Sequence, residues 1–188
     1  MAGNHSDTSV DKNIFIDELG FHKVNLTVFI KESDFVLSPS VQNSEHLFEL
    51  QFENIKQFNM NNQTGFLVVR FFDSFLFTDL QTFLTKMITK NNVVRTSGDV
   101  RWKFKIIEKN HKFIVVNQTD KKEYPIEDIS LFELRTKLKF DDKKKQRKRN
   151  NDISSSVTNS ESTKENPQPV KRNGFINRIF TVFKGSRL

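Results

Sequence analysis

Between residues 23 and 126 the chain repeatedly alternates apolar with polar residues, a period of two that predicts β-strands. Successive side chains of a strand point to opposite faces, so one set is buried and the other faces solvent. Gly65–Phe72 is instead almost continuously apolar, as expected for a central strand. The predicted strands are Lys23–Ile30, Asp34–Leu37, Leu47–Phe52, Gly65–Phe72, Val100–Ile107, Lys112–Val116 and Glu123–Ile126.

One segment, Thr78–Lys90, has the spacing of a helix. Its apolar residues recur every three or four positions and form one stripe, which predicts a helix that docks on the sheet. Thr78, with Gln81 three residues later, fits a capping box, in which each side chain bonds a free backbone amide at the helix start. The stripe consists of Leu80, Phe83, Leu84, Met87 and Ile88.

Asp128 is placed to cap a last helix, with Ile129, Phe132 and Leu138 facing inward. The whole pattern predicts a mainly β, α+β fold. We expect a small antiparallel, β-sandwich-like head of six or seven strands, with one mid-chain helix and one C-terminal helix.

The pattern also predicts the domain boundaries. Residues 14–140 carry the periodic segments and form the predicted head, after a polar lead at residues 1–13. Residues 141–170 are first basic and then rich in Ser and Thr, with almost no large apolar residue from Asn150 to Val170, so we expect a disordered linker. Residues 171–188 are predicted to be a short linear interaction motif.

The net charge of +7 is unevenly distributed. Residues 1–142 contain 18 Lys and Arg against 20 Asp and Glu, so the head is slightly acidic. Six of the seven residues from Lys143 to Arg149 are basic, and residues 171–188 add five basic residues and no acid. A domain that coats nucleic acid is usually basic itself, so we assign the attraction for nucleic acid to the tail.

One strand of the head is an exception. Arg101, Lys103 and Lys105 alternate with Val100, Trp102, Phe104 and Ile106, so the three cations share one face of the predicted strand. This face is either the solvated side of a half-buried sheet or a stripe that contacts DNA phosphates.

Several classes of chemistry lack the residues that they need. The chain contains no Cys, which excludes disulfides, a thiolate nucleophile and sulfur-ligated zinc. His22, His46 and His111 have no motif spacing, and no Gly-rich phosphate loop occurs. We therefore expect a non-enzymatic protein without a cofactor or metal.

The sequence predicts an intracellular protein, because it shows neither a secretion signal nor a membrane span. The first residues are polar and do not resemble a signal peptide, and no apolar run approaches the roughly 18 residues of a membrane span. We therefore do not expect the Asn-x-Thr triplets at Asn25, Asn62 and Asn117 to be glycosylated.

The basic cluster of the linker has the sequence KKKQRKR. It predicts a nuclear localisation signal, a nonspecific DNA contact, or a charged linker that keeps the protein soluble. Further on, Ser154–Ser156 and Thr158–Thr163 are candidate phosphorylation sites, and Lys164–Asn166 has the form of a KEN degron. The basic residues of the cluster are Lys143, Lys144, Lys145, Arg147, Lys148 and Arg149.

The C-terminal segment is both apolar and basic. Six of the nine residues from Phe175 to Phe183 are large and apolar. In a helix, Phe175, Ile179, Phe180 and Phe183 would share a face. Three uses fit this composition: an anchor for a pocket of a partner, a basic amphipathic helix on a membrane, or docking on the head.

The layout resembles the accessory factors of non-homologous DNA end joining, of the XLF and PAXX type. These proteins have a compact β-rich head, a basic linker and a C-terminal Ku-binding peptide with basic residues before Gly and a bulky apolar residue. Lys171, Arg172, Gly174 and Phe175 match that peptide. The family usually dimerises through a coiled-coil stalk, whereas the last predicted helix ends near Phe140. The sequence therefore does not decide whether this chain forms a homodimer.

The same segment is also similar to a second kind of peptide. Asn173, Ile176, Ile179 and Phe180 resemble a degenerate peptide that binds a sliding clamp, with Asn in place of the usual Gln and Ile in place of one aromatic residue. The partner expected from the resemblances is therefore either Ku-like or clamp-like. The predicted partner-binding residues are Lys171, Arg172, Gly174, Phe175, Ile176, Ile179, Phe180 and Phe183.

These observations lead to one main hypothesis, a nuclear adaptor or scaffold in DNA double-strand break repair that is recruited through its C-terminal peptide. A membrane-surface adaptor is the alternative, with residues 48–88 in a pleckstrin-homology-like fold and the basic C-terminal helix on anionic lipid. A third possibility is a lineage-restricted structural protein.

Overall fold

The computed structural model describes residues 13–96 and 99–138. The contacts within the chain divide it into two units, residues 1–135 and residues 136–188, and the fold below is that of the first unit. Apart from Asn13, the predicted lead at residues 1–13 lies outside the described residues, as do the predicted linker and the predicted C-terminal motif.

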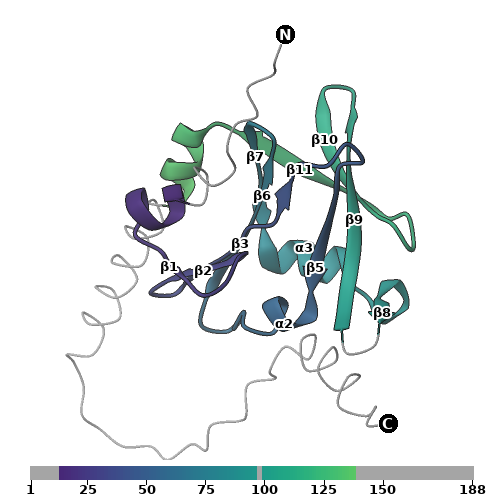
Figure 1. Ribbon diagram of the computed structural model, residues 1–188, viewed down its shortest axis with the longest axis horizontal. Coiled ribbons are helices and arrows are strands. Elements are labelled where there is room, and N and C mark those ends of the chain that lie inside the picture. The colour runs from purple at the N-terminus through teal and green to yellow at the C-terminus, as the bar shows by residue number, and fades with distance from the viewer. Residues whose placement is uncertain (1–12, 97–98, 139–188) are drawn as a thin grey trace, which may run out of the picture. The chain divides into compact units, whose positions relative to one another are not determined.

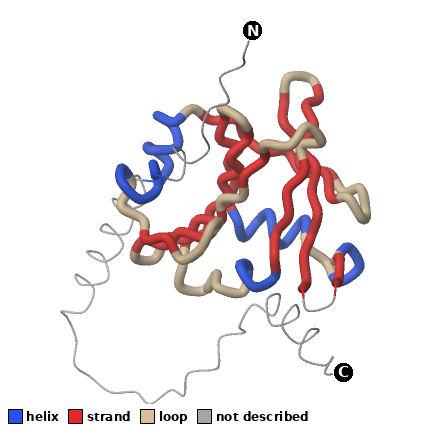
Figure 2. The backbone as a smooth tube through the Cα atoms, in the orientation of Figure 1, coloured by secondary structure: helices blue, strands red, loops and turns tan. Residues whose placement is uncertain are grey.

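Eleven strands of the described residues join into one continuous sheet (Figures 1 and 2). The sheet order is β1-β2-β3-β6-β7-β11-β10-β9-β5, while β4 pairs with β6 and β8 with β9. The bounds are β1 His22–Lys23, β2 Val28–Lys31, β3 Asp34–Leu37, β4 Ser40–Val41, β5 Leu47–Gln51, β6 Thr64–Phe71, β7 Ser74–Asp79, β8 Val94–Thr96, β9 Asp99–Lys109, β10 Lys112–Asn117 and β11 Glu123–Ile129.

The helices of the described residues are short. They are the π-helix η1 Ile14–Glu18, α2 Phe52–Ile55, α3 Leu80–Met87 and the 3₁₀-helix η2 Lys90–Asn92. A last helix begins at Leu131 and continues to Leu138. The predicted mainly β, α+β class is therefore confirmed.

The sequence led us to expect a purely antiparallel sheet, and this prediction is wrong. β3 and β4 both pair with β6 in parallel. Because β5 and α2 lie between β4 and β6 in the chain, the connection is long enough to return in the same direction, which a tight hairpin cannot do. The other strand pairs are antiparallel.

Strand β11 links the two halves of the sheet (Figure 1). Its first residues pair with β10, from Glu123 opposite Val116 to Ile126 opposite Phe113. Its last residues pair with β7, from Glu127 opposite Phe77 to Ile129 opposite Phe75. One strand therefore connects the β6–β7 hairpin with the β9–β10 hairpin.

The core lies between the sheet and α3. The predicted apolar stripe of this helix is confirmed, since its Leu80, Phe83, Leu84 and Met87 are buried. The Phe83 ring contacts the rings of Phe104 and Tyr124, with centroids 5.4 and 5.3 Å away. Helix α3 thus packs on β9 and β11 through aromatic contacts.

The predicted start of this helix is wrong. Asp79 is the N-cap, and its carboxylate accepts a hydrogen bond of 2.7 Å from the Thr82 amide. Thr78 belongs to β7, and its hydroxyl lies 3.0 Å from the Tyr124 hydroxyl. The polar residues before the apolar stripe are the end of a strand, so the first turn begins two residues later than predicted.

The strand predicted at Lys23–Ile30 is also wrong. It is a hairpin of β1 and β2, in which Lys23 lies opposite Phe29. The Asn25 side chain makes the turn by accepting hydrogen bonds from the amides of Thr27 and Val28 at 2.9 and 3.0 Å. Leu26, one of the apolar positions of the alternation that predicted this strand, is 67% exposed.

The last helix is capped differently from the prediction. Asp128 pairs with Leu76 inside β11. Ser130 is the cap, since its hydroxyl accepts from the Glu133 amide at 3.2 Å and the Glu133 carboxylate accepts from the Ser130 amide at 2.8 Å. Phe132, predicted to face inward, is 75% exposed, whereas Leu134 and Leu138 are buried.

Candidate functional site

The strand pair β5–β9 carries the cations that the sequence predicted for DNA contact. Trp102, Phe104 and Ile106 of β9 are buried. Alternation places Arg101, Lys103 and Lys105 on the opposite face of the strand. Across the pair, Gln51 lies opposite Arg101, Glu49 opposite Lys103 and Leu47 opposite Lys105. All three cations therefore stand beside β5.

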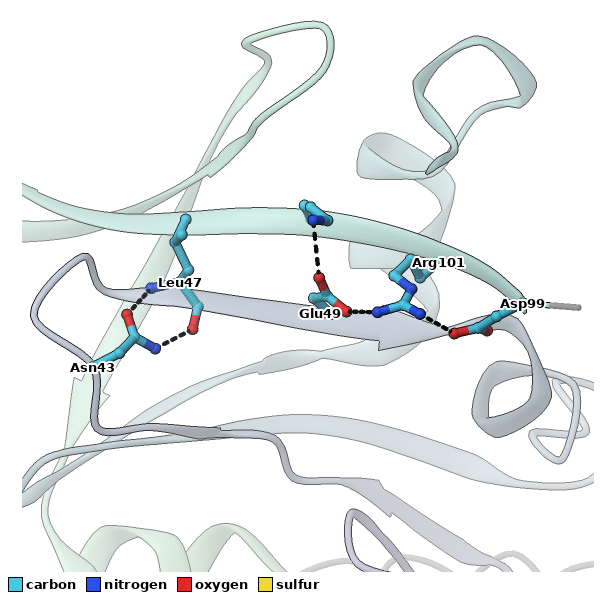
Figure 3. A network of polar contacts seen from close by, with 6 residues as sticks. Asn43, Leu47, Glu49, Asp99 and Arg101 are labelled. Carbon is cyan, nitrogen blue, oxygen red and sulfur yellow. Dashed lines mark hydrogen bonds and ion pairs between the residues drawn. The ribbon is translucent and has the colours of Figure 1, made fainter. Parts of the chain in front are cut away.

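Figure 3 shows that Arg101 lies between two carboxylates. Its Nη1 donates to Oε2 of Glu49 at 2.7 Å, and its Nη2 is 2.5 Å from Oδ2 of Asp99. The other Glu49 oxygen is 3.3 Å from Nζ of Lys103. Two acids and two bases thus form one network, and their formal charges cancel.

The network favours the charged form of the Arg101 guanidinium, which is the form present at neutral pH. The pKa of Arg101 is raised above its ordinary value, first by the hydrogen bond and charge of Glu49 and then by Asp99, while desolvation acts in the opposite direction. A raised pKa adds stability below the ordinary pKa, and this stability is lost only as the pH rises through the raised value. Both values are far above neutral pH. The Arg101 contribution is therefore constant across the physiological range.

These ion pairs reduce the positive charge that the β9 face presents to a phosphate. Arg101 and Lys103 would have to leave Glu49 and Asp99 before they contacted DNA. In the part of the chain that the structure describes, Lys105 alone among the three predicted cations has no carboxylate partner. Contact with DNA through this face remains a prediction. Of the three predicted cations, only Lys105 could contact a phosphate without first breaking an ion pair.

A cavity of about 290 Å³ lies beside the network. Part of its wall is apolar, with Leu37 and Leu50 buried and Leu26 largely exposed. Glu49 belongs both to the cavity wall and to the ion-pair network. The lining residues are Asn25, Leu26, Thr27, Leu37, Pro39, Glu49, Leu50, Gln51 and Asn54.

The polar part of the cavity wall is held in place by its own hydrogen bonds. Nδ2 of Asn25 donates to Oδ1 of Asn54 at 2.9 Å, and Nδ2 of Asn54 donates to the Thr27 hydroxyl at 3.0 Å. These bonds connect the β1–β2 turn with α2. Because the three side chains fix one another, the wall is ordered without a bound molecule.

The other predicted functional residues lie outside the described residues. This applies to the basic cluster at residues 143–149 and to the partner-binding residues between Lys171 and Phe183. In the described residues no group of three or more His, Asp or Glu could hold a metal ion. Nor does any described helix have the length and apolar character needed to span a membrane.

Sequence reasoning missed Glu49, Asp99 and the amides of the cavity as site residues. Glu49 appears in the sequence as an ordinary polar position of an alternating strand. Its role depends on β5 lying next to β9, about 50 residues further along the chain, and no local signal indicates that neighbour. Asn25 carried a signal, because Asn commonly makes turns through its own side chain.

The chain matches no protein-family model, and neither a curated protein nor a solved structure is significantly similar to it.

Proposed function

We propose that this protein is a non-enzymatic nuclear adaptor in DNA double-strand break repair, acting in end joining. Its β-sandwich-like head makes protein contacts. The cluster Lys143–Arg149 directs nuclear import and contacts DNA without sequence preference. Residues 171–183 recruit the protein to a Ku-like or clamp-like partner.

The observation that best supports this division of labour is that two of the three cations on the β9 face are paired with carboxylates. Arg101 and Lys103 are paired with Glu49 and Asp99. The basic clusters at residues 143–149 and 171–188 contain six and five Lys or Arg residues and no acid, whereas residues 1–142 contain 18 Lys and Arg against 20 Asp and Glu. Because bulk attraction for DNA follows uncompensated positive charge, the tail supplies it better than the head.

The test compares full-length protein with a Phe175→Ala/Phe180→Ala variant in nuclear extract. Retention is measured on an immobilised open-ended duplex and on the same duplex closed by hairpins. We expect the wild type to be retained through the open ends and the double variant to lose this retention, because truncation removes two aromatic anchors. Thr181→Ala is the matched control, since it alters the same segment without removing a large apolar side chain.

Normal retention of the double variant on open ends would contradict the proposal. Loss of binding to anionic vesicles by the same variant, without any preference for DNA ends, would favour the membrane-surface adaptor instead. Vesicle sedimentation with the full-length protein distinguishes the two functions.

A further inference from the structure

Strand β5 is an edge of the sheet, and one of its residues is covered by a side chain. The Leu47 amide donates to Oδ1 of Asn43 at 2.8 Å, and Nδ2 of Asn43 donates to the Leu47 carbonyl at 2.7 Å (Figure 3). A neighbouring strand would make the same pair of bonds. The Asn43 side chain thus occupies the first position of a missing strand.

The next positions of the same edge are open. In an antiparallel pair, the backbone groups of alternate residues face the neighbour and the others face away. Since those of Leu47 face away from β9, so do the Glu49 amide and carbonyl and the Gln51 amide. Within the residues that the structure describes, these three groups have no hydrogen-bond partner. Unpaired edge groups of this kind are a template for another strand.

The cavity lies along this open edge, since Glu49, Leu50 and Gln51 all line it. Leu37 and Leu50 form an apolar floor, and Leu26 is exposed at the rim. A volume of about 290 Å³ is at the lower limit of the roughly 300–1,000 Å³ of small-molecule sites. It suits one or two side chains of a segment that runs along β5.

The charges around the edge decide which class of partner fits. Glu49 is compensated by Arg101 and Lys103, and Arg101 also by Asp99. None of the described residues that line the cavity is a cation, so they offer a phosphate no positive charge to pair with. Free amide and carbonyl groups beside an apolar floor instead match an uncharged peptide backbone with an apolar side chain.

We propose that β5 binds an extended peptide segment of a partner protein, which adds to the sheet as a strand after Asn43. One peptide residue exchanges two hydrogen bonds with Glu49, and a carbonyl further along accepts from the Gln51 amide. The peptide residue opposite Leu50 points to the same side as Leu50, into the cavity, and is apolar. None of the residues that form this surface belongs to residues 171–183, so its test is independent of recruitment through the tail.

The backbone of Gln51 permits a specific block. Its φ of −85° and ψ of 140° are close to values that proline adopts. The Gln51→Pro variant removes the outward amide and places the ring on the edge, while the bonds to β9 are kept because they come from alternate residues. Gln51→Ala is the matched control, since it loses the same side chain but retains the amide.

The experiment selects random octapeptides displayed on phage against immobilised full-length protein and removes those that bind Gln51→Pro. Selected peptides are synthesised, and their affinities are measured by fluorescence polarisation. We expect Gln51→Pro to weaken binding by at least about tenfold, which corresponds to the loss of one hydrogen bond, and Gln51→Ala to bind as the wild type does. Methylation of successive peptide amides should weaken binding at the one position whose amide donates to the Glu49 carbonyl, and should be tolerated at the two adjacent positions, whose amides face away from β5.

Three results would overturn the proposal. The first is a selection in which no peptide prefers the wild type to Gln51→Pro. The second is a set of peptides in which every methylated amide is tolerated, since side chains alone would then mediate binding. The third is a wild-type dimer in sedimentation that Gln51→Pro dissociates, since a second copy of the chain would then occupy the edge. Circular dichroism of Gln51→Pro establishes that the variant is folded.

Discussion

Gly65 illustrates how a single residue sets the packing of the head. It lies in β6 opposite Phe35 of β3. A Cβ atom at this position would be 2.4 Å from Cζ of Phe58. Phe58 is only 3% exposed, and its ring is 5.2 Å from the Phe35 ring. Glycine is therefore needed here for the close approach of a buried ring.

We expect Gly65→Ala to lower the free energy of unfolding by about 1–3 kcal/mol, the usual cost of overpacking a core. Urea denaturation followed by the fluorescence of Trp102 measures the change. In the Gly65→Ala/Phe58→Leu double variant, the shorter side chain makes room for the methyl group. The double variant should therefore lose less free energy of unfolding than the sum of the losses in Gly65→Ala and Phe58→Leu. Equal stability of Gly65→Ala and the wild type would show that the ring moves without cost.

Along β9 the sequence predicts which side chains are buried but not which residues pair with the exposed ones. The alternation of β9 correctly placed Trp102, Phe104 and Ile106 in the core, because burial follows from the period of two. It did not reveal that Arg101 is held by Glu49 and Asp99. An ion pair across strands depends on register, which is fixed only once the strands are adjacent.

At the scale of elements, the N-cap of α3 makes a definite prediction. The Asp79 carboxylate satisfies the Thr82 amide at the helix start. We expect Asp79→Ala to lower stability by about 1 kcal/mol and Asp79→Asn to have little effect, because Asn caps as well as Asp does. Thermal unfolding by circular dichroism compares the three proteins. Identical midpoints for the Ala and Asn variants would mean that the cap contributes nothing.

Two hairpins show when the sequence predicted separate elements and when it did not. The strands of the β9–β10 hairpin were predicted at Val100–Ile107 and Lys112–Val116, because the polar residues Lys109 and Asn110 separate them. Strand β7 was missed because its turn from β6 consists of Phe72 and Asp73, and Phe72 has a φ of 48°. A bulky residue rarely adopts this conformation, so Phe72 itself gives no signal for the turn.

At the scale of the whole molecule, the order of strands was not accessible from sequence. Nothing local indicates that β5 lies beside β9, or that β3 and β6 run in parallel. The candidate site depends on those pairings, because Glu49, Arg101 and the cavity meet only in the folded sheet. The distribution of charge, by contrast, is a property of the sequence itself, and it leads to the last prediction.

The salt dependence of DNA binding tests which part of the chain contacts DNA, as the proposed function requires of residues 143–149. Six engaged cations at residues 143–149 predict a slope of about −5 for log K against log salt on duplex DNA. Lys143→Gln/Lys144→Gln should make the slope less steep by about 2, since two phosphate contacts are lost. The matched variant Arg101→Gln/Lys103→Gln removes the same charge from the head and should leave the slope unchanged, because both cations already pair with Glu49 or Asp99. Fluorescence anisotropy at several salt concentrations measures both. An equal change in the head variant would mean that the β9 face contacts DNA after all.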